Sequence, residues 1–290
     1  MRKAACLLVF LAACGDDGPP TDDPLVLDGG RITVAGCDYE VITRVDAEEP
    51  ALGADVLGAD PDPIQVHLGL GGDPKTSMVI LWRTDVDTTS TIIKYGEGAS
   101  LDETAAGVTY IFVAGVGGVG DALRMHEGHL CGLQPGTEYS YQVGGVNAAG
   151  DEHFSPTYTF HTAPDITASP DAEVTIAYSG DTRNGYDAWS DTASQILQHT
   201  PDLLVYTGDI VTLGPLQSDW DGFFEAAPEL YASVPLVSAH GNHEINSISY
   251  YAQLAMPGDE ENYAFDYGHL HQIVVNTDPT AVGDLFDKIP

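Results

Sequence analysis

The second half of the chain alternates between apolar runs and stretches whose apolar residues recur at helical spacing. The apolar runs cover residues 174–178, 203–206 and 234–237. Between them, residues 188–199 and 220–231 place bulky apolar side chains three and four positions apart, which is typical of one helix face. Pro228 is expected to kink or end the second helix. This order of strands and helices predicts an α/β domain built on a parallel sheet.

Residues 63–163 show a different pattern, in which short β-type runs are separated by turn residues. The expected strands cover residues 64–68, 77–82, 91–95, 108–113, 139–143 and 157–162. Many short strands joined by regular turns predict an all-β sandwich. Residues 164–172 are polar and contain proline, and we interpret them as a linker to the α/β domain at residues 173–290.

Each apolar run of the α/β domain is followed by a turn that carries glycine and an oxygen donor. These turns are Gly180-Asp181, Gly208-Asp209 and Gly241-Asn242-His243-Glu244. The carboxyl ends of parallel strands meet at one edge, which is where open α/β sheets bind ligands. Asp181, Asp209 and Asn242 are hard oxygen donors, and we expect them to converge there as ligands of a two-metal site. The alternative is that these side chains cap the following helices.

The turns carry a resemblance to a known family. Residues 174–278 resemble the first half of the calcineurin-like metallophosphoesterase domain, a match that extends through the stretch 263–268, His271 and residues 276–278. Trp82 and the stretch 133–139 resemble the corresponding parts of fibronectin type III domains. Taken together, the two halves resemble bacterial relatives of purple acid phosphatases. The resemblance implies a multidomain protein, with a fibronectin-like sandwich followed by an incomplete βαβ-type metallophosphatase sheet.

The resemblance also implies a role for each turn residue. Asp181 matches a ligand of the first metal ion, Asp209 matches the carboxylate that bridges both ions, and Asn242 matches a ligand of the second. His243 matches the catalytic histidine that contacts the phosphoryl group of the substrate. The implied cofactors are two divalent or trivalent metal ions, Fe, Mn or Zn. The implied reaction is hydrolysis of phosphate monoesters by a metal-bound hydroxide.

Two alternatives stay open at this point. One is a phosphodiesterase or nucleotidase of the same superfamily, and the other is a non-catalytic envelope lipoprotein with a degenerate phosphatase domain. The second is supported by Thr212, which replaces the chromophoric tyrosine of purple members, and by Arg183, which replaces a metal-ligating histidine of other members. We interpret Arg183 either as a clamp for a phosphate oxygen or as a surface arginine that pairs with nearby carboxylates.

The remaining histidines offer no further metal ligands with the family's spacing. Gly268-His269-Leu270-His271 fits the Gly-His-x-His motif of the family, but it lies in the stretch that matches the strand after Glu244, so we interpret His271 as structural. His240 precedes the third turn and is an alternative neighbour of the site. Surface or core positions are expected for His67, His126, His129, His153, His161 and His199. We therefore expect the sequence to be a fragment of a longer phosphatase, without the C-terminal part of the catalytic domain.

The charge balance excludes one class of partner. The chain has 44 acidic and 10 basic residues and a formal net charge of −34. Nucleic-acid binding is not expected, because it depends on lysine and arginine neutralising phosphates. The same field would repel an anionic phosphate ester unless bound cations inverted it locally. Solubility, or tolerance of high salt, is the simpler interpretation of most of the carboxylates.

The N-terminus has the pattern of an export signal. Arg2 and Lys3 precede a short apolar stretch at residues 4–12, and Leu11-Ala12-Ala13-Cys14 resembles a bacterial lipobox. This predicts a signal peptide at residues 1–13, lipidation of Cys14, and a tether and N-terminal segment at residues 14–62. The protein would then be anchored by lipid in the bacterial envelope, facing the periplasm or the cell surface. An ordinary secretory signal with an incidental cysteine is the alternative.

Two cysteines remain once Cys6 is assigned to the signal peptide and Cys14 to the anchor. In an oxidising compartment, Cys37 and Cys131 are candidates for a disulfide. Two buried thiols are the alternative.

Overall fold

The computed structural model describes residues 9–11, 31–33, 36–42, 61–84, 88, 90–115, 122–147, 149–258 and 260–277. Cys14 and most of the predicted signal peptide and tether lie outside these residues, as does the stretch from 278 to 290. The described parts of the N-terminal region include the short strands β1 (Val9–Leu11), β2 (Arg31–Thr33) and β3 (Glu40–Ile42). In the described part of the chain, no helix has the length and apolar character needed to span a bilayer.

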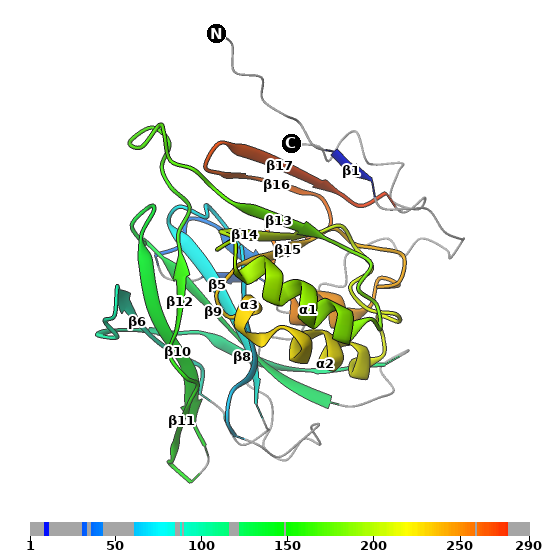
Figure 1. Cartoon of the computed structure of the whole chain (residues 1–290). Helices are drawn as coiled ribbons and strands as arrows, with labels where there is room; N and C mark the ends of the chain where they lie inside the picture. The colour runs from blue at the N-terminus through cyan, green and yellow to red at the C-terminus, as the bar shows by residue number, and fades with distance from the viewer. Residues whose placement is uncertain are drawn as a thin grey trace.

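Two antiparallel sheets form the first domain (Figure 1). The first sheet has the order β4 (Ile64–Gly69), β5 (Ser77–Thr84), β9 (Ala122–Cys131) and β8 (Val108–Val113). The second has the order β11 (Glu152–Phe154), β10 (Glu138–Val146), β6 (Ile92–Glu97) and β7 (Glu103–Ala106), and β12 (Tyr158–His161) also pairs with β10. The β-rich first domain predicted from the sequence is therefore confirmed.

The longest strand of the sandwich, β9, was not predicted from the sequence, because polar residues interrupt its apolar pattern. Four of its polar side chains are buried, namely Arg124, His126, Glu127 and His129. His126 stacks on Trp82 with ring centroids 5.1 Å apart, and its two ring nitrogens lie 2.7 and 2.8 Å from the hydroxyls of Thr84 and Thr91. Buried polar side chains that hydrogen-bond to partners in other strands give β9 the composition of a surface segment, which hydrophobicity alone does not identify as core.

The second domain is built on three parallel strands in the order β13 (Ile176–Ser179), β14 (Leu203–Tyr206) and β15 (Leu236–Ser238). Helix α1 (Tyr186–Leu197) follows β13 and helix α2 (Gln217–Ala226) follows β14 (Figure 1). Helix α3 (Pro228–Tyr231) has Pro228 at its amino end, so the expected break at this proline is observed. The parallel α/β arrangement is confirmed.

After β15 the chain forms a short helix, α4 (Ile248–Gln253), and a hairpin of β16 (Tyr263–Tyr267) and β17 (Leu270–Val275). Strand β1 pairs in parallel with β17. Side-chain hydrogen bonds join the hairpin to the parallel sheet. Tyr263 donates to the Ser238 carbonyl over 2.7 Å, and the hydroxyl of Tyr178 donates to Gln272 Oε1 over 3.1 Å.

Strand β5 explains why the two domains pack as one body. All eight of its residues are buried, and its side chains alternate between two apolar environments. Met78, Ile80 and Trp82 belong to the main core, whereas Val79 and Leu81 pack with Ala255 of the second domain. A strand with both faces covered reads as a continuous apolar run rather than an alternating one. The interface also contains the ion pair of Arg83 with Asp221, at 2.7 Å.

A disulfide joins Cys37 to Cys131, with the two Cα atoms 5.1 Å apart. It ties the N-terminal segment to the end of β9. Beside it, the hydroxyl of Tyr39 lies 2.9 Å from Nδ1 of His129, and Nε2 of His129 lies 2.6 Å from Glu127 Oε1. Burial raises the pKa of the Tyr39 hydroxyl to about 12, so this tyrosine stays protonated in the network at neutral pH.

Acid should destabilise the sandwich through His126. Burial, together with the charge of Arg124, lowers the pKa of His126 to about 3. The unfolded chain takes up this proton near pH 6.5 and the folded chain does not, so the stability is present above pH 6.5 and is lost as the pH falls towards 3. Between pH 6.5 and 4.5 this loss should be roughly 2–3 kcal/mol.

The measurement is urea unfolding of the wild type and His126→Gln from pH 7 to pH 4.5. The variant should lose less stability over this interval than the wild type, although it starts less stable. His161→Gln, at a side chain that is 56% exposed, is the control and should follow the wild type. Equal slopes for the wild type and His126→Gln would contradict the assignment.

Candidate functional site

The turns that follow β13 and β14 have a backbone conformation that side chains of L-residues rarely adopt. The φ angles are +56° at Asp181, +47° at Arg183 and +55° at Asp209. Each such residue costs about 1 kcal/mol or more relative to glycine, and such residues cluster at functional sites. The turns therefore fix the direction in which each of these three side chains leaves the backbone at the carboxyl edge of the sheet.

The backbones of the two turns are bonded to each other. The N–H of Asp181 donates to the carbonyl of Gly208 over 3.1 Å, and the N–H of Arg183 donates to the carbonyl of Asp209 over 3.3 Å. The third turn joins through a side chain, because the N–H of His243 donates to Asp209 Oδ1 over 3.1 Å. Three segments that are distant in sequence thus converge on Asp209, which is buried with 8% of its surface exposed.

Glu244 fixes the second and third turns relative to each other. Its side chain is fully buried. Oε2 accepts the N–H groups of Asp209 at 3.0 Å and Gly241 at 2.8 Å, and Oε1 accepts the N–H group of Ile210 at 2.7 Å. Burial raises the pKa of the Glu244 carboxyl, and the N–H groups of Asp209 and Gly241 counteract that rise because they stabilise the ionised form.

Two glycines are required by this close approach. A Cβ atom at Gly241 would collide with Asp209 and with the carboxylate of Glu244. Gly208 has a φ of +95°, and a Cβ there would lie 2.9 Å from Cα of Gly241. The glycines of the motifs therefore allow the turns to touch, which brings the donor side chains together.

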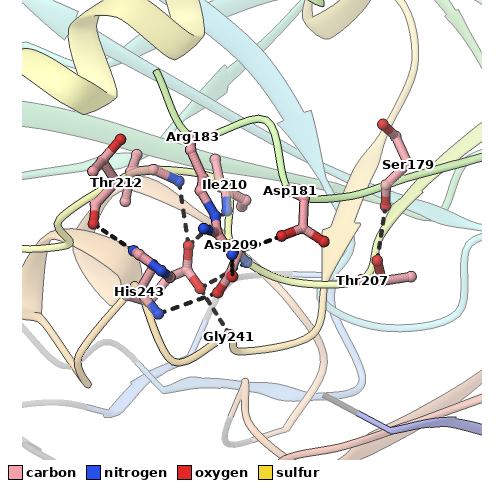
Figure 2. A network of polar contacts seen from close by, with 11 residues as sticks. Ser179, Asp181, Arg183, Thr207, Asp209, Ile210, Thr212, Gly241 and His243 are labelled. Atoms are coloured by element: carbon pink, nitrogen blue, oxygen red, sulfur yellow. Dashed lines mark hydrogen bonds and ion pairs between the residues drawn. The ribbon is translucent and has the colours of Figure 1, made fainter. Parts of the chain in front are cut away.

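Arg183 lies between the two carboxylates predicted to bind metal (Figure 2). Its Nη2 is 2.8 Å from Asp181 Oδ1 and 2.7 Å from Asp209 Oδ2. The hydrogen bond with Asp209, followed by the charges of both aspartates, raises the pKa of the guanidinium. Both carboxylates thus direct an oxygen at one cationic atom.

His243 is oriented by a backbone carbonyl. Its Nδ1 lies 2.6 Å from the carbonyl oxygen of Thr212, which can only accept, so Nδ1 carries the proton (Figure 2). The second ring nitrogen, Nε2, is not used in this hydrogen bond. Asn242, next to His243 in the same turn, is exposed.

The structure therefore brings together Asp181, Arg183, Asp209 and His243, and it places Asn242 in the same turn as His243. Among the residues that the structure describes, no group of three or more histidine, cysteine, aspartate or glutamate side chains has the arrangement of a metal site. The donors available here are two carboxylates and the carboxamide of Asn242. The side-chain oxygen of Thr212 is buried and has no hydrogen-bond partner within the described part of the chain.

Gly268 and His269 form the turn of the β16–β17 hairpin, and Leu270 and His271 begin β17, at the other end of the sheet. His269 Nε2 lies 3.0 Å from the carbonyl of Pro170, and Tyr267 donates to the carbonyl of Asp202, which precedes β14. His271 is exposed and pairs with Asp266 at 2.6 Å. The contacts with Pro170 and Asp202 are on the amino-terminal side of β13 and β14, opposite to the edge that holds Asp181. The structural role of His271 stays a prediction.

His240, the other histidine considered near the site, is packed between aromatic rings. Its ring centroid is 4.9 Å from that of Tyr250 and 6.1 Å from that of Tyr251. The sequence pattern alone assigns no role to Glu244, although it stands in the third turn. The available signal is a carboxylate three residues after Gly241, in the turn that follows an apolar strand, where backbone N–H groups need an acceptor.

Comparison with known proteins gives two adjoining family matches. Residues 63–162 match the purple acid phosphatase N-terminal domain, and residues 174–289 match the calcineurin-like phosphoesterase family. Acid phosphatase type 7 from Homo sapiens is 30% identical, over 74% of this chain and 49% of its own length. Purple acid phosphatase 21 from Arabidopsis thaliana is 28% identical, over 74% of this chain and 48% of its own length.

The structure is similar to that of the purple acid phosphatase PPD1 from yellow lupin seeds. The TM-score is 0.60 at 19% sequence identity, and the match covers 71% of this chain and 43% of the lupin chain. At this identity the likeness concerns the fold. The chain spans about half the length of the curated relatives it matches.

Replacement of Glu244 by glutamine should unfold this edge of the sheet more readily. An amide group in place of one carboxylate oxygen would set a donor against backbone N–H donors in a fully buried position. The expected loss is about 3–5 kcal/mol in the free energy of unfolding, measured in urea. Glu225→Gln, on the exposed side of α2, is the matched control and should change stability by less than about 0.5 kcal/mol. A similar small change in both variants would show that Glu244 does not hold the turns.

Proposed function

Because the chain belongs to the purple acid phosphatase branch of the calcineurin-like phosphoesterases, we propose that it hydrolyses phosphate monoesters at a two-metal site. The site would lie at the carboxyl edge of β13, β14 and β15. The observation that carries the proposal is the convergence of Asp181 and Asp209, through three bonded turns, on a single cationic atom.

The donors present suit metal ions. The guanidinium nitrogen Nη2 of Arg183 occupies the position that a metal ion would take, since one oxygen of each carboxylate points at it. Asp181 and Asp209 would hold one ion, and Asp209 and Asn242 would hold the other. Fe, Mn or Zn would be accepted by such a set completed by nitrogen ligands. When bound, two ions would supply Lewis acidity that activates water and polarises the ester.

His243 would bind the phosphoryl group through Nε2. Its Nδ1–H is committed to the carbonyl of Thr212, so the ring cannot rotate without losing that hydrogen bond. A protonated Nε2 would donate to a phosphate oxygen and stabilise the charge that develops there. The contact is valuable in a chain of net charge −34, whose general field repels an anionic ester.

Replacement of the bridging carboxylate tests the proposal. In protein expressed from the whole gene, Asp209→Asn should lower turnover of p-nitrophenyl phosphate by about a hundredfold or more, because a ligand shared by both ions is weakened. Asp266→Asn is the matched control, since Asp266 is 74% exposed and lies on the hairpin away from the site. Bound metal is measured in parallel by elemental analysis.

Two results would change the assignment. Faster hydrolysis of bis(p-nitrophenyl) phosphate than of the monoester would favour a phosphodiesterase or nucleotidase. A wild-type protein that retains no metal and turns over neither ester would instead favour a non-catalytic envelope protein, for which Thr212 and Arg183 are the supporting departures from the family pattern.

We further propose that the protein is exported and held in the bacterial envelope by lipid on Cys14, as the stretch Leu11–Cys14 suggests. Cys14→Ser should abolish incorporation of labelled palmitate and release the protein from the membrane fraction. Cys6→Ser, within the predicted signal peptide, is the control and should leave labelling intact. Unchanged labelling of Cys14→Ser would exclude the anchor. Nucleic-acid binding is not part of the proposed function.

A further inference from the structure

Arg183 occupies the position between the two carboxylates that the proposed function assigns to a metal ion. Its Nη2 uses one N–H for Asp181 Oδ1, at 2.8 Å, and the other for Asp209 Oδ2, at 2.7 Å. The remaining oxygen of Asp209, Oδ1, accepts the N–H of His243 at 3.1 Å. Both oxygens of this carboxylate are therefore engaged before any ion binds.

A metal ion and this guanidinium would exclude each other. Ligand oxygens lie about 2.0–2.2 Å from ions such as Zn²⁺, which is closer than the N–O distances here. An ion bound by the same two oxygens would thus contact the guanidinium, and two cations at that separation repel each other strongly. The arginine must leave before an ion can take its place.

The local structure allows that departure. The backbone of this turn is held by the N–H of Arg183 on the carbonyl of Asp209, and by Thr182, whose hydroxyl lies 2.9 Å from that of Tyr206. The side chain is held through Nη2, by Asp181 and Asp209, whereas its Nε has no hydrogen-bond partner among the residues that the structure describes. The side chain of Arg183 is 41% exposed, and that of Asp181 is 73% exposed. The guanidinium can therefore swing into solvent while the backbone stays in place.

We propose that Arg183 is an internal counter-cation that competes with the first metal ion for Asp181 and Asp209, and so sets how tightly this site binds metal. The inference rests on the proposed two-metal site. In the absence of metal, the guanidinium neutralises two carboxylates that would otherwise repel each other. When the metal concentration rises, the ion displaces it.

Metal titration of charge variants tests the competition. Binding of Mn²⁺ alone to the metal-free protein is measured by isothermal titration calorimetry, together with the shift in melting temperature. Arg183→Gln removes the competing charge and should bind Mn²⁺ about tenfold more tightly, because two partly exposed ion pairs no longer have to be broken. Without metal, the same variant should have a lower melting temperature than the wild type. Addition of Mn²⁺ should raise the melting temperature of the variant by more than that of the wild type.

Three further variants locate the effect. Arg83→Gln removes an ion pair of equal length outside the site, at Asp221, and should leave Mn²⁺ affinity unchanged. Asp181→Asn in the Arg183→Gln background should abolish the gain. If Arg183→Gln does not fold, Arg183→Leu is used instead, and it should tighten binding to a similar extent because it removes the competing charge without adding a metal ligand.

The outcomes separate this inference from the proposed function. Equal or weaker Mn²⁺ binding by the Arg183 variants, with a wild type that binds two ions, would overturn the competition and leave the metal site standing. Absence of Mn²⁺ binding in the wild type and in every variant would overturn both.

Discussion

The buried carboxylate of Glu244 is the interaction on which the geometry of the site depends. It accepts hydrogen bonds from the N–H groups of Asp209, Ile210 and Gly241, which belong to turns after two different strands. A carboxylate without these donors would be costly to bury, and N–H groups without it would lack an acceptor. Each side thus stabilises the other. As a result, Asp209 cannot move independently of the turn that carries Asn242 and His243.

Contacts within the second domain and with the sandwich fix the strand that leads to the turn of Glu244. Tyr250 and Tyr263 both donate to the carbonyl of Ser238, the last residue of β15. The hydroxyl of Tyr141 in the sandwich donates to the carbonyl of Ala232, just before β15, over 2.6 Å. The sandwich contributes none of the polar side chains of the described site, yet it holds the segments that lead into the third turn. Its role is therefore to position, and mutations in the interface should act on stability before they act on chemistry.

The sequence predicts those helices and strands whose local residue pattern matches their burial in the folded protein. The range expected for β14 coincides with the observed one, because four apolar residues lie between a proline and a glycine and are buried on both sides. Pro228 separates α2 from α3 for another local reason, because proline has no N–H group to continue the helix. Strand β9 was missed because its polar residues are satisfied by partners far away in sequence, such as the Thr84 and Thr91 hydroxyls on His126.

The site shows the same division. The three turns could be located from glycines, carboxylates and strand-like runs, because backbone conformation and order along the chain are local properties. The role of Glu244 depends on which turns touch, and the pairing of Arg183 depends on where two separate carboxylates meet. Both are properties of the assembled edge, and the spacing of Glu244 after Gly241 does not say which turns its carboxylate joins.

The position of Arg183 is informative because positive charge is scarce. The chain has 10 lysines and arginines against 44 acidic residues, so most of its carboxylates have no basic partner available. One of these few cations nevertheless bridges Asp181 and Asp209, one of which is largely buried. Exposed carboxylates are solvated by water and gain little from pairing, whereas two carboxylates that the fold forces together repel each other unless a counter-charge lies between them. The arginine therefore meets the electrostatic requirement of the turns themselves, and a metal ion at this edge has to outcompete a cation that the fold already supplies.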